Sequence, residues 1–397
     1  MLDGMSEQAA GVAEGFGAVA DAFRRNFEDP GEDAAAVAVF HRGVKVVDLW
    51  GGTDVLHQRP MPDDGRMMVA SCSKGITAAV LAVLVERGEL DPEDRVTAYW
   101  PEFAAAGKDQ ITVTMVASHT AGLPYPPLGT GLNGLDLHRG EAVTRALAAA
   151  HPLWKPGTAM AYHPVTYGTL LDEIVRRATG ASIGSHVRTL IAEPLGVDMW
   201  IGAPAAVIPR VVPGQWEESS PMEPAELDPE PGSYAALRQQ FLRENPPMDP
   251  DFSDPDDVRA HYMAERPAVG AITNARALAT MYAALLGPIG GMRLITDETR
   301  IAVSRPRTDD LETLIESGTA GPDIRFGVGY QLASPSMPGF GPSSFGHTGA
   351  GGRLGIADPD YHVGFGYTCS RLRDIGAQGD PRWATLIAAT RTCIERS

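Results

Sequence analysis

Segments with β-strand character occur at both ends of this chain, and the patterns between them are mostly helical. Near the beginning, two β-rich runs flank Arg42-Gly43 within residues 34–52, which predicts a hairpin. In the last third, three Gly-punctuated segments predict consecutive antiparallel strands: 326–332, 344–359 and 362–370. This arrangement indicates one sheet built from both ends of the chain, with the helical middle as an insertion.

Amphipathic and apolar periodicity predicts the helices. The patterns fall at 1–28, in the apolar run after Ser71 that ends at Arg87-Gly88, and at 112–124, 166–180, 276–287 and 381–395. A length of 397 residues fits two domains. We expect an α/β (α+β) domain from residues 1–110 and 288–397, and a mostly helical domain from residues 111–287.

A strongly acidic, Pro-rich stretch covers roughly residues 203–258. From Glu217 to Asp257 there are twelve acidic residues against two arginines. The stretch is too long for a simple turn and predicts an excursion over the surface. It is either a solvated mobile loop or a lid or pocket wall that shapes access to a site.

The overall charge and the three cysteines exclude several classes of protein. Lys plus Arg is 33 and Asp plus Glu is 50, a net charge of −17 that disfavours nucleic acid and anionic membrane surfaces as partners. No apolar run reaches the length of a membrane span, and the first residues lack the pattern of a signal peptide. Widely spaced Cys72, Cys369 and Cys393 favour a reduced cytoplasmic protein without a zinc site.

A candidate nucleophile stands in Ser71-Cys72-Ser73-Lys74. If a helix starts at Ser71, Lys74 lies one turn later on the same face, and the unpaired N–H groups of the helix start are available to an anion. A desolvated lysine has a lowered pKa and can exchange a proton near neutral pH. Alone, S-x-x-K is a weak signal, and Ser73 and Ser182 are rivals. Ser182 matches G-x-S-x-G but follows the helix predicted at 166–180 instead of a strand, which favours a helix C-cap turn.

Three further motifs follow in order: His119-Thr120-Ala121-Gly122-Leu123, Pro156-Gly157 with Tyr162 five residues later, and His347-Thr348-Gly349. With these, the chain resembles the serine β-lactamase and penicillin-binding-protein superfamily. It is most similar to the family VIII carboxylesterases, which have a class C β-lactamase fold. The resemblance spans roughly residues 30–395 and implies an antiparallel sheet flanked by helices plus a mostly helical domain.

The resemblance also implies a set of roles. Ser71 is the acylated nucleophile, Lys74 takes or relays its proton, and Tyr162 is a partner base whose phenol pKa is lowered by Lys74. Which of these two groups accepts the proton stays open. The oxyanion hole is formed by the backbone N–H groups of Ser71 and Ala350. No metal and no organic cofactor is implied.

Two departures from the β-lactamase motifs concern substrate recognition. Pro164 replaces the asparagine of Tyr-x-Asn, and His347 replaces the lysine that gives a fixed charge for the β-lactam carboxylate. A neutral histidine gives little of that charge. We therefore expect a serine carboxylesterase acting on a small-molecule, neutral, short-acyl ester. The alternatives are an acyltransferase or amidase, a β-lactamase or D,D-peptidase with weak lactam activity, and a binding protein on a retired hydrolase fold.

The remaining candidates line the predicted pocket. His347 and Gly349 belong to the strand motif, and the alternative for His347 is a side chain that only lines the pocket. His163 either orients Tyr162 or only packs, and His119 is expected to be structural. Positions near the motifs make four aromatic residues candidate pocket walls, with a place in the core as the alternative for each: Tyr125, Trp154, Trp216 and Phe345.

Overall fold

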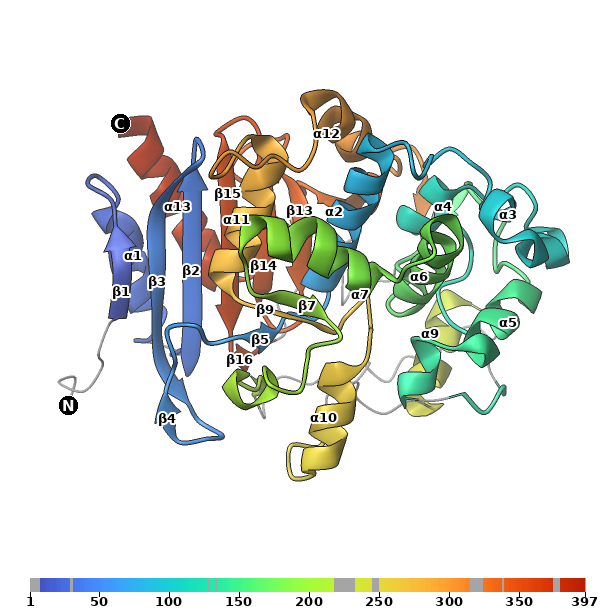
Figure 1. Ribbon diagram of the computed structural model, residues 1–397, viewed down its shortest axis with the longest axis horizontal. Helices are drawn as coiled ribbons and strands as arrows, with labels where there is room; N and C mark the ends of the chain where they lie inside the picture. The colour runs from blue at the N-terminus through green and yellow to red at the C-terminus, as the bar shows by residue number, and fades with distance from the viewer. Residues whose placement is uncertain are drawn as a thin grey trace.

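A large antiparallel sheet organises the molecule (Figure 1). The computed structural model describes residues 8–28, 31–127, 129–132, 134–217, 233–244, 250–314, 324–337, 339–373 and 379–396. The sheet order is β1-β3-β2-β15-β14-β13-β12-β11, with β4 paired to β3. Its strands are β1 Gln8–Val12, β2 Ala34–His41, β3 Val44–Asp54, β4 Arg59–Pro60, β11 Arg325–Phe326, β12 Gln331–Leu332, β13 Phe345–Gly349, β14 Arg353–Asp358 and β15 Val363–Cys369.

The two ends of the chain meet at the centre of this sheet. β2 pairs with β3 on one side and with β15 on the other, in register from Ala35↔Cys369 to His41↔Val363. The turn between β2 and β3 uses Arg42 and Gly43 at φ of +50° and +79°, the left-handed values that a tight hairpin requires. The predicted hairpin and the predicted single sheet from both ends are confirmed.

Helices cover both faces of the sheet. α1 (Gly17–Arg25) and α13 (Pro381–Arg396) lie on one face, and α11 (Ala275–Leu286) and α2 (Cys72–Glu86) lie on the other (Figure 1). β2 shows the alternation expected of a strand buried on both sides. Its odd-numbered residues 35–39 pack with α1 and α13, and its even-numbered residues 34–40 pack with α11.

Two expectations about boundaries need correction. The helix predicted over 1–28 is instead the edge strand β1 followed by the shorter helix α1; residues 1–7 lie outside the described part. The range 111–287 assigned α11 to the helical domain, but α11 packs directly on β2, β14 and β15. Gly364 and Gly366 of β15 allow this approach, because a Cβ there would overlap with α11 atoms. The division into two domains otherwise remains a prediction.

The rest of the chain is mostly helical. Its helices are α3 Val96–Tyr99, α4 Val113–Ala117, α5 Glu141–Ala149, α6 Thr166–Thr179, α7 Ile183–His186, α8 Glu193–Leu195, α9 Tyr234–Glu244, α10 Pro255–Met263 and α12 Asp297–Ser304. Short strands accompany them: β5 Met67–Met68, β7 Met199–Ile201 and β9 Ala271–Thr273 form one sheet, β6 Ala159–Met160 pairs with β10 Glu312–Thr313, and β8 Gln215–Trp216 pairs with β16 Arg371–Leu372.

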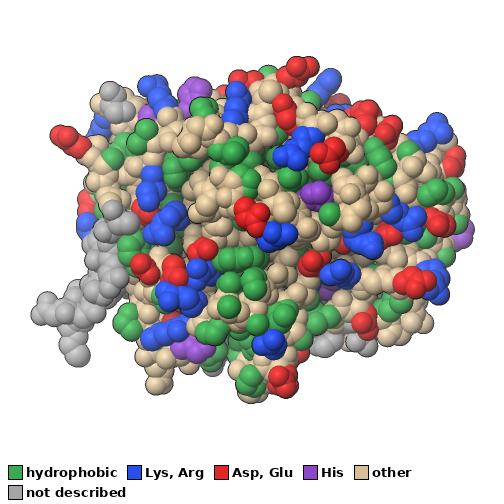
Figure 2. Space-filling view, in the orientation of Figure 1, with side chains coloured by type: hydrophobic (Ala, Val, Ile, Leu, Met, Phe, Trp, Pro, Cys, Tyr) green, Lys and Arg blue, Asp and Glu red, His purple; other side chains and the backbone are tan. Residues whose placement is uncertain are grey.

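The acidic stretch is more regular than a surface loop. It contains α9 and α10, so the described part of the predicted loop is partly helical; residues 218–232 and 245–249 lie outside the described part. On the face shown in Figure 2, basic side chains alternate with acidic ones, so the negative charge is not gathered there in one patch. None of the helices described has the length and apolar character needed to span a bilayer.

Candidate active site

Ser71 stands at a sharp turn between a strand and a buried helix. β5 ends at Met68, Ala70 has φ +45°, and Ser71 is the N-cap of α2. A non-glycine residue in the left-handed region is strained and is held there by its surroundings. A serine at this position usually caps its helix, but the Ser71 side chain makes no capping hydrogen bond. Its hydroxyl is therefore available for chemistry.

Lys74 is fully buried and lies beside that hydroxyl. Its Nζ is 3.2 Å from Ser71 Oγ, 2.9 Å from the Pro164 carbonyl oxygen and 3.0 Å from the Ala268 carbonyl oxygen. Burial holds the pKa of Lys74 well below its usual value. A neutral amine has two hydrogens and one lone pair. The two carbonyls take the hydrogens, so the lone pair can accept the Ser71 proton.

Tyr162 completes the group. Lys74 Nζ lies 4.8 Å from the centroid of its ring, and the phenol is hydrogen-bonded to Ser71. The resemblance implied a lowered phenol pKa, and this is wrong for the structure. Burial raises the pKa of Tyr162 above its usual value, and the hydrogen bond to Ser71 offsets only part of that effect. Tyr162 is therefore a neutral phenol at neutral pH.

Strand β13 lies against the start of α2. Cys72 Sγ donates a hydrogen bond to the His347 carbonyl oxygen at 3.3 Å. A Cβ on Gly349 would overlap with the Val69 carbonyl, so a side chain there would push the strand away. The predicted motif residues His347 and Gly349 are thus brought to the nucleophile by close backbone packing.

His347 adds no positive charge to the site. It is 2% exposed, its ring centroid lies 6.1 Å from that of Tyr162, and its Nδ1 bonds to the Thr348 carbonyl oxygen at 2.6 Å. Burial, and then the neighbouring Lys74, lower the pKa of His347 to about 3. Its Nε2 has no hydrogen-bond partner among the described residues. His347 therefore presents a neutral imidazole.

Two backbone amides near the nucleophile are unengaged. Within the part of the chain that the structure describes, the N–H groups of Ser71 and Ala350 have no backbone acceptor. Ala350 directly follows β13, which Cys72 ties to α2. Two unpaired donors on neighbouring elements are the requirement for an oxyanion hole.

Two buried histidines, His119 and His163, lie beside Tyr162 and bind the backbone next to it. The backbone N–H of His163 donates to His119 Nδ1 at 3.1 Å, and the His119 ring lies 4.8 Å from the Tyr162 ring. His163 Nε2 accepts from the Leu123 N–H at 3.1 Å, and its Nδ1 donates to the Ala161 carbonyl at 2.6 Å. Burial lowers the pKa of His163 to about 3. Both neutral rings fix the backbone beside Tyr162, as expected for a structural His119.

The predicted pocket walls lie in different surroundings. Trp154 stands edge-on to His163 at 6.1 Å, and Tyr125 packs in a small cluster with Phe241 of α9. Phe345 is fully buried against Tyr330, with ring centroids 4.9 Å apart, which is the core placement weighed for these positions. Trp216 belongs to β8, which pairs with β16.

The sequence interpretation missed two aromatic neighbours of Tyr162. The Tyr234 hydroxyl, on α9, donates to the Tyr162 carbonyl oxygen at 3.1 Å and is bonded by Tyr125. Phe326 of β11 stacks on Tyr162 with centroids 6.2 Å apart. The spacing of Tyr234, Leu237 and Phe241 was the available signal for α9, because it places them on one helix face.

The two rival serines have structural contacts. Ser73 Oγ donates to the Ala70 carbonyl at 2.6 Å and accepts from the Ala271 N–H at 2.9 Å. Ser182 is the N-cap of α7, and its hydroxyl accepts from the Ser185 N–H at 3.2 Å. Among the described residues, neither hydroxyl has a lysine or histidine as a hydrogen-bond partner, whereas Ser71 has Lys74.

Comparison with known proteins gives a consistent result. The family model described as Beta-lactamase matches residues 19–390. The chain is 32% identical over 381 residues to the Esterase/beta-lactamase LipL of Mycobacterium tuberculosis, covering 90% of this chain and 81% of LipL.

Two solved structures are similar along almost the whole chain. A family VIII carboxylesterase matches with a TM-score of 0.83 and 33% identity, covering 97% of this chain and 100% of that one. EstA from Arthrobacter nitroguajacolicus Rue61a matches with a TM-score of 0.82 and 33% identity, covering 98% and 99%. The chain therefore belongs to the Beta-lactamase family and is a serine hydrolase with the β-lactamase/transpeptidase-like fold.

Proposed function

We propose that this protein is a carboxylesterase that hydrolyses neutral, short-acyl esters through an acyl-enzyme on Ser71. The observation that carries the proposal is the position of Lys74. Its buried Nζ lies 3.2 Å from Ser71 Oγ, and the Pro164 and Ala268 carbonyls accept two of its hydrogens, which leaves a deprotonated Nζ free to take the Ser71 proton. The names of the relatives, LipL and the family VIII carboxylesterase among them, support ester substrates.

The reaction has two acyl-transfer steps. Ser71 Oγ attacks the ester carbonyl carbon while its proton passes to Lys74 Nζ, and the carbonyl oxygen becomes an oxyanion between the N–H groups of Ser71 and Ala350. The C–O bond to the alcohol then breaks, and the alkoxide takes a proton from the Lys74 ammonium directly or through the Tyr162 phenol. Water attacks the acyl-enzyme by the same route and releases the acid and free Ser71.

The electrostatics of the pocket support a neutral substrate. In the proposed reaction, a positive charge arises transiently on Lys74 when it takes the Ser71 proton. His347 stands where β-lactamases have a lysine, and with a pKa of about 3 it is uncharged at neutral pH. Pro164 offers no side-chain amide to a lactam substituent, and its carbonyl is used by Lys74. An acyl group without a carboxylate therefore suits the site best.

The test is hydrolysis of p-nitrophenyl acetate and butyrate near pH 8 by the wild type, Ser71→Ala and the matched control Ser182→Ala. We expect Ser71→Ala to lose at least about a thousandfold in kcat/KM, because the acyl-enzyme cannot form. Ser182→Ala should keep its activity, since that hydroxyl only caps α7. A folded wild type that hydrolyses neither ester, or an active Ser71→Ala, would overturn the proposal.

A further inference from the structure

The turn that carries Ala350 is held by two buried arginines. Residues 350–352 join β13 to β14. The Ala350 carbonyl accepts from Arg353 Nη1 at 2.7 Å, and the Gly351 carbonyl accepts from Arg382 Nη2 at 2.8 Å. The first two carbonyls of the turn are therefore bound, while the Ala350 N–H has no backbone acceptor among the described residues.

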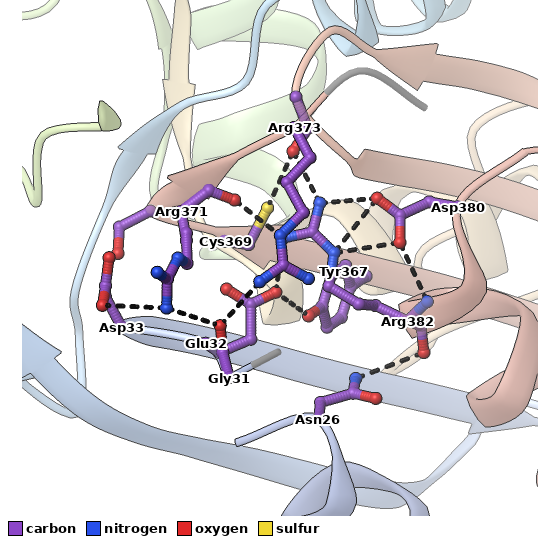
Figure 3. A network of polar contacts seen from close by, with 12 residues as sticks. Asn26, Gly31, Glu32, Asp33, Tyr367, Cys369, Arg371, Arg373, Asp380 and Arg382 are labelled. Atoms are coloured by element: carbon purple, nitrogen blue, oxygen red, sulfur yellow. Dashed lines mark hydrogen bonds and ion pairs between the residues drawn. The ribbon is translucent and has the colours of Figure 1, made fainter. Parts of the chain in front are cut away.

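Arg382 uses all five of its N–H donors (Figure 3). Nε and Nη2 bind the two oxygens of Asp380 at 2.9 and 2.5 Å. Nη1 binds Glu32 Oε1 and the Arg371 carbonyl, each at 2.7 Å, and Nη2 also binds Gly351. The planar guanidinium fork makes these bonds simultaneously, which a lysine ammonium with three donors cannot do.

The turn is shaped to admit this guanidinium. A Cβ on Gly352 would overlap with Arg382 Nη2 and with Asp380 Oδ2, and Gly352 has φ +106°. A side chain at this position would therefore displace Arg382 and strain the backbone. This close approach explains the glycine at position 352, while a Cβ on Gly351 would overlap with Leu372.

The buried ion cluster of Arg382, Glu32 and Asp380 is not explained by stability alone. Arg382 is 4% exposed, and Glu32 and Asp380 are buried as well. Burial raises the pKa of Glu32 to about 7 despite the Arg382 charge beside it. A buried ion cluster is often no more stabilising than apolar residues of the same volume. Its contacts instead join a residue before β2, the start of α13 and the turn after β13 at one point.

We propose that Arg382, braced by Glu32 and Asp380, is a positioning residue for the oxyanion hole. It fixes the turn so that the Ala350 N–H is already in place when charge develops on the substrate oxygen. Donors that are held in place before the reaction stabilise that charge without reorganisation. This inference rests on the proposed function, because it concerns the oxyanion amide of the same site.

The test compares Arg382→Lys with the control Arg276→Lys. Arg276 also forms an ion pair, from Nε to Asp48 Oδ2 at 2.6 Å, but it is less buried than Arg382 and joins α11 to β3 instead of holding the turn. For each variant we measure kcat and KM with p-nitrophenyl butyrate, inhibition by n-butylboronic acid, which forms a tetrahedral adduct with the serine, and thermal unfolding.

We expect Arg382→Lys to lower kcat by about tenfold to a hundredfold with KM within about twofold of the wild type. Affinity for the boronic acid should fall by a similar factor, since an oxygen of the adduct accepts a hydrogen bond from the same Ala350 N–H. Arg276→Lys should keep kcat and boronic acid affinity even if it unfolds at a lower temperature. If Arg382→Lys does not fold, Glu32→Gln keeps the side-chain volume and should lower kcat by about threefold or more, again without raising KM.

Two negative results can be told apart. A wild type that neither hydrolyses the ester nor binds the boronic acid overturns the proposed function and this inference with it. An active wild type, with wild-type kcat and boronic acid affinity in the folded variant tested, overturns only the role of Arg382. A loss of activity matched by an equal loss in Arg276→Lys at the same stability also overturns it.

Discussion

Lys74 Nζ lies over the aromatic ring of Tyr162, 4.8 Å from its centroid. No carboxylate of the described residues pairs with this nitrogen, whose hydrogen-bond partners are two carbonyl oxygens and a hydroxyl. The same burial lowers the pKa of Lys74 and raises that of Tyr162. The two groups therefore titrate far apart, and Lys74 is the one that loses its proton first.

This separation predicts the pH profile of the enzyme. Because the base must be unprotonated, kcat/KM should rise with pH through the lowered pKa of Lys74 and then stay level to about pH 9, since Tyr162 keeps its proton. Hydrolysis of p-nitrophenyl butyrate from pH 5 to 9 checks this. Lys74→Arg stays charged and should lose at least about a thousandfold at every pH. An alkaline fall below pH 9 would contradict the assignment.

Charge at position 347 should control the use of anionic lactams. The wild type should turn over nitrocefin poorly, because His347 is neutral at pH 7. We expect His347→Lys to raise kcat/KM for nitrocefin by about tenfold through pairing with the lactam carboxylate, without raising the rate on the neutral ester. His347→Gln is the neutral control and should give no gain. Nitrocefin turnover by the wild type that rivals its ester turnover would show the charge argument to be wrong.

Ser182 should matter for stability alone. Its hydroxyl caps α7 by accepting from the Ser185 N–H. Ser182→Ala should lower the free energy of unfolding by about 1 kcal/mol, the usual cost of losing such a cap. Urea unfolding followed by circular dichroism measures this loss. The folded variant should hydrolyse esters at the wild-type rate. If Ser182→Ala loses ester turnover without losing stability, Ser182 becomes a candidate nucleophile again.

Ionisation of Glu32 should make stability depend on pH. Its pKa is about 7 in the folded protein and 4.5 in the reference state, so the folded state binds the extra proton between these values. The contribution of Glu32 to the free energy of unfolding is fully present below pH 4.5 and is lost as the pH rises through 7. From pH 5 to 8, the wild type should therefore lose about 1 kcal/mol or more of unfolding free energy relative to Glu32→Gln. If the unfolding free energies of the wild type and Glu32→Gln change with pH by the same amount, this prediction is wrong.

The parts of the site that follow from short-range order were predictable. Ser71 and Lys74 are three residues apart on one helix, so their contact follows from helix geometry alone. The hairpin at Arg42-Gly43 and the strand segments after residue 325 carry their own turn residues and periodicity. The resemblance to the β-lactamase superfamily, which rests on the motifs and their order, then implied that Tyr162 and His347 join them.

The parts that depend on tertiary burial were not predictable. The lowered phenol pKa implied for Tyr162 by the resemblance considered the charge of Lys74 alone. It left out the desolvation of the buried phenol, which raises the pKa. Arg382 lies 32 residues beyond Ala350 in sequence and carries no motif, so only the folded chain shows that it holds that turn. Tyr234 falls in an acidic stretch whose composition conceals the apolar face of α9.

The pairing of β2 with β15 has a consequence for synthesis on the ribosome. β2 is complete when residue 41 has emerged, but its partner spans residues 363–369. Until residues 363–369 emerge, the nascent chain therefore presents an unpaired, apolar strand edge, the kind of surface that chaperones cover and that aggregates when they do not. Because α13, with Arg382 at its start, is made after β15, the turn between β13 and β14 gains its contact with Arg382 only after both of these strands have been synthesised.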